Sequence, residues 1–126
     1  MKWFFAVLLI VSIGGPAAAN TVKRTDFKML TTQHLYNLCA ARKTDPLRDK
    51  AIYFCFGFFT GAAHYHRGLG AGRGHIVCPP ENRQLSRIEA VRAFVAWARV
   101  NRKYMTEKPI DGLVRAMVAK WPCPAK

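Results

Sequence analysis

Four cysteines constrain the fold of this 126-residue chain more than any other feature of its sequence. They are Cys39, Cys55, Cys78 and Cys123, and all of them follow an N-terminal segment with the features of an export signal. An even number of cysteines in an exported chain favours disulfides over zinc ligands or free thiols, so we expect two disulfides and no free thiol. Four cysteines allow three pairings, and their number alone does not choose among them.

The predicted export signal comprises residues 1–19. Lys2 precedes an apolar run from Trp3 to Ile13, and three alanines end at Ala19, where we expect cleavage. This run is well short of the roughly 20 residues that span a bilayer, so the uncleaved signal peptide is the only expected membrane contact. We therefore expect an exported protein with a mature domain of residues 20–126.

The mature chain is long enough for one small domain, and its hydrophobic periodicity predicts only helices. The expected helices lie within residues 31–42, 47–66, 86–100 and 110–121, after a loose lead-in at residues 20–30. Thr31 or Thr32 would cap the first helix, and Ser86 and Glu89 form a capping box at the third. The expected fold is all-α, a small bundle of four helices tied by two disulfides.

Three of these helices carry an apolar stripe that should face the core. The expected inward residues are Leu35, Leu38 and Cys39 in the first helix, Ile88, Val91, Phe94, Val95, Trp97 and Ala98 in the third, and Ile110, Leu113, Val114, Met117 and Trp121 in the fourth. The second helix differs, because AIYFCFGFFTGAA is apolar on every side, which is typical of a helix at the centre of a bundle. Gly57 and Gly61 would let another helix approach it closely.

Hairpin packing favours one of the three disulfide pairings. The short KTDP turn should make the first two helices antiparallel and bring Cys39 near Cys55. If the third and fourth helices also form an antiparallel hairpin, the segment that enters the third lies beside the end of the fourth. Cys78 would then pair with Cys123, and each bridge would hold one hairpin together.

Lys and Arg outnumber Asp and Glu by 20 to 7, which favours an anionic partner. Export argues against nucleic acid and for an envelope polymer, a membrane surface or an acidic protein, although a merely solvated surface is an alternative. The cationic loop RGLGAGRGH supplies the expected partner contacts Arg67, Arg73 and His75. A simple connector is the alternative interpretation of this loop.

Cofactor, metal and catalytic chemistry are not expected. A dinucleotide fingerprint needs a strand before the glycine-rich loop and a helix after it, whereas here a helix precedes it and prolines follow. His64, His66 and His75 are not expected to bind a metal, because residues two apart on a helix point in different directions. Oxidation of Cys55 would remove the nucleophile of the one tempting Cys–His pair.

Several landmarks occur in an order that spans most of the mature chain. They are Cys39, Cys55-x-x-Phe58-x-x-Gly61, Cys78-Pro79, and a tail with Pro109, Leu113, Val114, Ala116 and Trp121-Pro122-Cys123. This order resembles the Rap/Tai-type family of periplasmic immunity proteins, which neutralise amidase effectors of type VI secretion systems. The resemblance implies a small, non-enzymatic helical inhibitor that is located in the periplasm, can form a homodimer and occludes the active-site groove of a secreted peptidoglycan amidase.

Two other functions remain open. A cationic envelope-binding module would use the arginines outside the predicted core against anionic polymer or lipid, and salt should release it. These arginines are Arg67, Arg73, Arg83, Arg92 and Arg99. A small periplasmic chaperone would instead expose apolar surface under stress.

Overall fold

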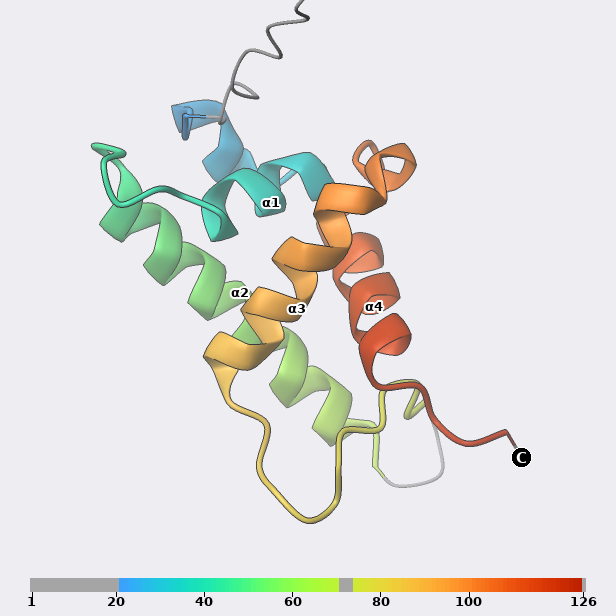
Figure 1. Ribbon diagram of the computed structural model, residues 1–126. Helices are drawn as coiled ribbons and strands as arrows, with labels where there is room; N and C mark the ends of the chain where they lie inside the picture. Colours follow the sequence, from blue (N-terminus) through green and yellow to red (C-terminus); the bar gives the residue numbers. More distant parts are fainter. Residues whose placement is uncertain (1–20, 71–73, 126) are drawn as a thin grey trace, which may run out of the picture.

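The computed structural model describes residues 21–70 and 74–125 (Figure 1). Its elements are the 3-10 helix η1 (Arg24–Lys28), α1 (Thr32–Cys39), α2 (Arg48–Gly68), α3 (Arg87–Val100), the 3-10 helix η2 (Arg102–Tyr104) and α4 (Pro109–Lys120). The predicted fold, a small all-α bundle of four helices with two disulfides, is confirmed. The predicted signal peptide, residues 1–19, lies outside the described residues, and no helix in the described part is long and apolar enough to cross a membrane.

The core lies around α1 and α3, each of which packs against the other three helices. Leu35 and Leu38 of α1 are fully buried, as is Phe94 of α3, whose ring meets that of Phe59 edge to face at 5.8 Å between centroids. In Figure 1, α2 and α4 lie to either side of α3. The short α1 thus contributes more to the core, residue for residue, than the much longer α2.

The expectation that α2 lies at the centre of the bundle is wrong. Ala51, Cys55 and Phe59, spaced by four, are its buried residues, whereas Tyr53 and Tyr65 are 76% and 73% exposed. A helix of 21 residues is about 31 Å long, and a domain this small has too little chain to surround it.

The N-caps Thr31 and Ser86 are confirmed, but the expected capping box at α3 is only half formed, because the Glu89 carboxylate pairs with Arg83 instead of the Ser86 backbone N–H. The Thr31 hydroxyl accepts a hydrogen bond from the N–H of His34, and the Ser86 hydroxyl accepts one from the N–H of Glu89. Thr32 has a different role, since its hydroxyl donates to the Lys108 carbonyl at 2.9 Å and ties the start of α1 to the start of α4.

Two smaller expectations are also corrected. Ile88 and Ile110 are 52% and 42% exposed because each lies in the first turn of its helix, where the partner helices do not cover it. The segment expected to be a loose lead-in contains η1, which is organised by the buried carboxylate of Asp26. That carboxylate accepts hydrogen bonds from the backbone N–H of Lys23 and the side-chain amide of Asn37.

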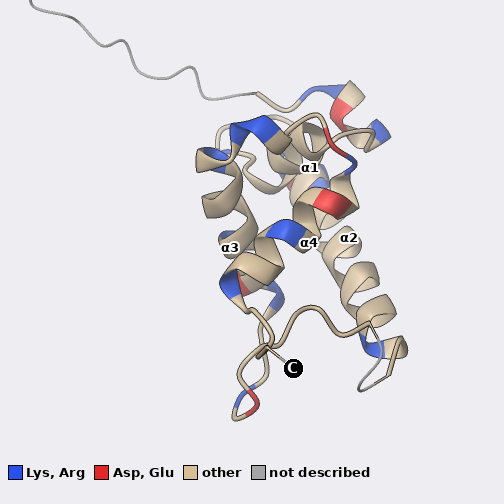
Figure 2. Ribbon diagram, turned by 90° about the vertical axis from the view of Figure 1, so that its right-hand side faces the viewer, with Lys and Arg blue, Asp and Glu red and all other residues tan. Residues whose placement is uncertain are grey.

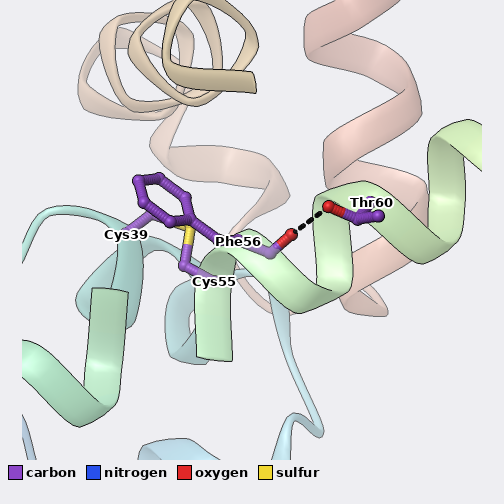
Figure 3. Close-up of a disulfide and its surroundings, with 4 residues drawn as sticks. All are labelled: Cys39, Cys55, Phe56 and Thr60. Atoms are coloured by element: carbon purple, nitrogen blue, oxygen red, sulfur yellow. Dashed lines mark hydrogen bonds between the residues drawn. A yellow bond between two sulfur atoms is a disulfide. The ribbon is translucent and has the colours of Figure 1, made fainter. Parts of the chain in front are cut away.

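The two disulfides have the pairing that hairpin packing favours. Cys39–Cys55 joins the end of α1 to α2, with 5.3 Å between Cα atoms (Figure 3). Cys78–Cys123 joins the segment before α3 to the segment after α4, with 4.8 Å between Cα atoms. Beside it, Val77 and Pro122 form an isolated antiparallel bridge.

Candidate partner-binding site

The predicted partner contacts lie at the C-terminal end of α2. Arg67 is exposed in the last turn, and the His75 ring stacks on the His66 ring at 4.6 Å between centroids. The stack holds the chain that enters α3 against the end of α2. Arg73 lies outside the described residues.

His66 has an unusual environment for a histidine near the surface. Its Nε2 atom is buried and has no hydrogen-bond partner among residues 21–70 and 74–125. Burial lowers the pKa of His66, and the neighbouring His75 and Arg67 lower this pKa further because they disfavour a second positive charge. The neutral form of the stacked ring is therefore favoured.

The segment that carries His75 is also fixed from its other side. The Cys78 N–H donates to the Trp121 carbonyl at 2.9 Å, next to the Cys78–Cys123 bridge. The disulfide and the histidine stack thus position the described part of this loop relative to both α2 and α4.

The described histidines are not gathered into a group of metal-ligating side chains. Across residues 21–70 and 74–125, no three His, Cys, Asp or Glu side chains are grouped to hold a metal ion. His64 and His66 are two residues apart on α2, and His66 is the one that stacks on His75.

Several arginines are already occupied by groups of the same chain. Arg83 forms a bidentate ion pair with Glu89, with N···O distances of 2.6 and 2.8 Å. Arg115 forms one with Glu107, with N···O distances of 2.7 and 3.0 Å. Arg87 lies over the Phe56 ring, with its guanidinium carbon 4.6 Å from the ring centroid. These guanidinium groups have their charge or their face engaged, and they are less available to a partner.

Arg92 and Arg99 are different, because they are exposed and have no ion pair or hydrogen bond with the described residues. They flank a groove of about 340 Å³ between the end of α1 and the middle of α3. The rest of the groove lining is small and apolar: Cys39, Ala40, Ala41, Val91, Val95 and Ala96. The sequence identified both arginines as members of a cationic face, but it did not indicate the groove between them.

Charge is unevenly distributed over the helices. Figure 2 shows Lys and Arg on α3 and α4, whereas the middle of α2 carries neither positive nor negative residues. Residues 51–63 of α2 contain no charged side chain. The molecule therefore presents cationic faces and one uncharged helix face.

Comparison with known proteins identifies the family. Residues 31–123 match the family of Rap1a immunity proteins, and no curated protein or solved structure matches the chain. The match runs from the N-cap of α1 to the last cysteine, so it includes all four α-helices, both disulfides and the groove. The chain belongs to the family of Rap1a immunity proteins.

Proposed function

We propose that the protein is exported through the signal peptide of residues 1–19 to the periplasm, where it binds and inhibits a peptidoglycan amidase effector of a type VI secretion system. The observation that carries this proposal is the family match over residues 31–123, which makes the chain an immunity-type protein. The two disulfides support export, because such bonds persist in oxidising compartments.

Inhibition would occur by binding and would need no catalysis by this chain. Five of its seven carboxylates are engaged in hydrogen bonds or ion pairs within the chain: Asp26, Asp45, Asp49, Glu89 and Glu107. The available surface groups are mainly cationic. Arg67, Arg73 and His75 would contact acidic groups of the amidase and block its substrate groove.

The direct test uses the mature protein and a candidate peptidoglycan amidase effector, which is sought among the genes beside its own. Release of soluble fragments from purified peptidoglycan is measured with and without the protein. We expect inhibition that saturates at a fixed molar ratio, and Arg67→Ala with Arg73→Ala should weaken it while leaving the melting temperature unchanged. Arg24→Ala, which removes an exposed arginine of η1, is the matched control.

Three measurements separate the alternative functions. Undiminished amidase activity in the presence of excess protein would reject the immunity proposal. Salt-reversible binding to peptidoglycan or anionic vesicles without any amidase would favour an envelope-binding module. Protection of an unfolding client protein, with increased ANS fluorescence, would favour a chaperone.

We further propose that two copies associate through the exposed face of α2. Tyr53, Gly57, Gly61 and Tyr65 follow one another at intervals of four and are all exposed. No atom of another described helix lies within 4 Å of the position that a Cβ would take at either glycine, so none of the described helices makes the close approach that the glycines permit. The order of these four residues, Tyr-Gly-Gly-Tyr, is the same from either end. A two-fold axis at its midpoint would therefore bring Gly57 of one copy to Gly61 of the other.

Charge favours a second copy on this face. Two strongly cationic copies repel each other least where neither carries a charge, and residues 51–63 are uncharged. Light scattering after size exclusion should give twice the monomer mass for the wild type and the monomer mass for Tyr53→Lys with Tyr65→Lys. Val100→Lys, at an equally exposed apolar position on α3, should remain dimeric. A monomeric wild type would reject the dimer.

A further inference from the structure

We propose that the groove between the end of α1 and α3 binds an amphipathic helix of a partner protein that carries two carboxylates seven residues apart. The partner is the amidase effector, and in this respect the inference rests on the proposed function. The groove lies at the Cys39–Cys55 disulfide, whereas Arg67 lies in the last turn of α2 and His75 in the segment that leads to the other disulfide, so the groove is a separate contact surface.

The spacing of the two free arginines sets the spacing of the carboxylates. Arg92 and Arg99 are seven residues apart on α3, so they lie on the same side of the helix and about 10.5 Å apart along its axis. A second helix that lies along the groove has the same rise per residue. Its residues i and i+7 therefore face the two guanidinium groups, one at each end of the groove.

The floor of the groove suits a helix that comes close. Val95 and Ala96 lie between the arginines on α3, and Ala40 and Ala41 line the opposite side at the end of α1. These side chains are small, and the groove volume of about 340 Å³ can accept one or two apolar side chains from positions i+3 and i+4 of the partner.

The groove is also held in shape before any partner binds. Cys39 is itself part of the lining, it is buried, and its disulfide fixes the end of α1 to α2. A preformed groove loses little conformational entropy on binding.

Carboxylates suit the two free arginines of this site. Arg83 and Arg115 each donate two hydrogen bonds to one carboxylate of this same chain. Arg92 and Arg99 are free to form the same bidentate pair with a carboxylate of a partner. A hydrophilic anionic polymer or a layer of lipid headgroups supplies charge but no apolar side chain at the level of the groove floor. A protein helix satisfies the charged ends and the apolar middle together.

The first test uses a synthetic peptide and needs no amidase. The probe is a capped helical peptide with Glu at positions i and i+7 and Leu at i+4, and the matched control peptide has Gln in place of both Glu residues. Each is titrated into the ¹⁵N-labelled mature protein. We expect saturable shifts of the backbone signals of Val91, Val95 and Ala96 with the Glu peptide, and at least tenfold weaker binding of the Gln peptide.

Variants locate the contact. Arg92→Gln with Arg99→Gln should weaken binding of the Glu peptide at least tenfold, whereas Arg24→Gln, which removes an exposed arginine outside the groove, should leave it unchanged. The inference is overturned if the shifts spread over the whole cationic surface, or if the double variant binds the peptide as the wild type does. Shifts of the same groove signals by phosphatidylglycerol vesicles but not by the Glu peptide would overturn it in favour of a lipid surface.

A second test assigns the helix to the effector. Arg92→Glu with Arg99→Glu should lower the affinity for the amidase at least tenfold, and Arg24→Glu should not. If the wild type fails to inhibit the amidase while the Glu peptide still binds, the proposed function is wrong, but the groove is still a binding site for an acidic helix. If the wild type inhibits but the double variant inhibits equally well, the groove is not the effector's site and the proposed function remains.

Discussion

Among single residues, Gly112 determines how closely α4 approaches α1. A Cβ at this buried position would collide with the side chain of Thr32. Thr32 cannot easily move away, because it is fully buried and its hydroxyl donates to the carbonyls of Glu107 and Lys108 at the start of α4. Displacing it would leave buried polar groups unpaired, which costs about 1–3 kcal/mol.

Substitution of two glycines by alanine should therefore have opposite effects. Gly112→Ala should lower the free energy of unfolding by about 1–3 kcal/mol, because the added methyl group overpacks a filled contact. Gly57→Ala should raise it by up to about 1 kcal/mol, because that helical position is open and alanine is the better helix former. Urea unfolding at a protein concentration that keeps the chain monomeric measures both. Equal effects at the two sites would contradict the close approach.

The histidine stack predicts a specific pH dependence. The pKa of His66 is lowered in the folded chain, first by burial and then by His75 and Arg67. Above the ordinary pKa of histidine, His66 is neutral in both the folded and the unfolded chain, so it adds no pH dependence to the stability. As the pH falls through that value, the unfolded chain takes up its proton first, so stability decreases until the folded-state pKa is passed.

Replacement of His75 tests this account. His75→Ala should raise the pKa of His66 toward its ordinary value, because it removes a nearby positive charge and part of the burial. An NMR titration of the His66 ring protons measures the shift. The loss of stability between neutral and mildly acidic pH should become smaller in the same variant. An unchanged pKa would show that the stack does not control His66.

At the level of helices, local signals were predictable and the choice of buried face was not. Thr31 and Ser86 cap their helices through hydrogen bonds to residues three positions later, so the sequence contains the whole interaction. The disulfide pairing followed from short connections between antiparallel helices. By contrast, the buried side of α2 depends on where α1 and α3 pack, and a sequence that is apolar on all sides does not encode that choice.

The groove could not be predicted for a related reason. Arg83, Arg92 and Arg99 look alike in the sequence, but Glu89 neutralises Arg83 and leaves the other two free. Which arginine finds a carboxylate depends on the path of the chain before α3. The predicted contacts Arg67 and His75 do lie at one end of α2, and their role in binding stays a prediction.

Each disulfide holds one helical hairpin, so its removal should destabilise the domain. Cys39→Ala with Cys55→Ala, or Cys78→Ala with Cys123→Ala, should each cost about 2–5 kcal/mol in urea unfolding. The two losses differ in their local effect. Without Cys78–Cys123 the segment of His75 is less well held, so the pKa of His66 should also rise toward its ordinary value.

The Cys39–Cys55 variant is the control for that second effect, since its disulfide lies on the α1 side of α2, away from the histidine stack. If the pKa of His66 is the same in both variants and in the wild type, the stack is held without help from the disulfide. Peptide mapping without reduction verifies the pairing in the parent protein.

Across the described molecule, charge is unevenly distributed among the helices. The full chain carries a net charge of +13, and removal of Lys2 with the signal would leave +12. The 13 uncharged residues at positions 51–63 form most of α2, so the cationic groups lie on the other elements and at the two ends of this helix. Two proposed contacts, the dimer on α2 and the acidic helix in the groove, use these two kinds of surface.

Salt should therefore act on the two contacts in opposite directions. Raising the NaCl concentration shortens the Debye length from about 30 Å at 0.01 M to about 3 Å at 1 M, which screens exposed charges. Self-association should tighten, because screening weakens the repulsion between two cationic copies whose contact face is uncharged. Binding of the Glu peptide should weaken, because it depends on attraction to Arg92 and Arg99. Sedimentation velocity and fluorescence anisotropy over the same salt series measure the two affinities. If self-association weakens as salt is added, the dimer interface contains charged groups and is not the uncharged face of α2. If the affinity for the Glu peptide does not change with salt, Arg92 and Arg99 are not its contacts.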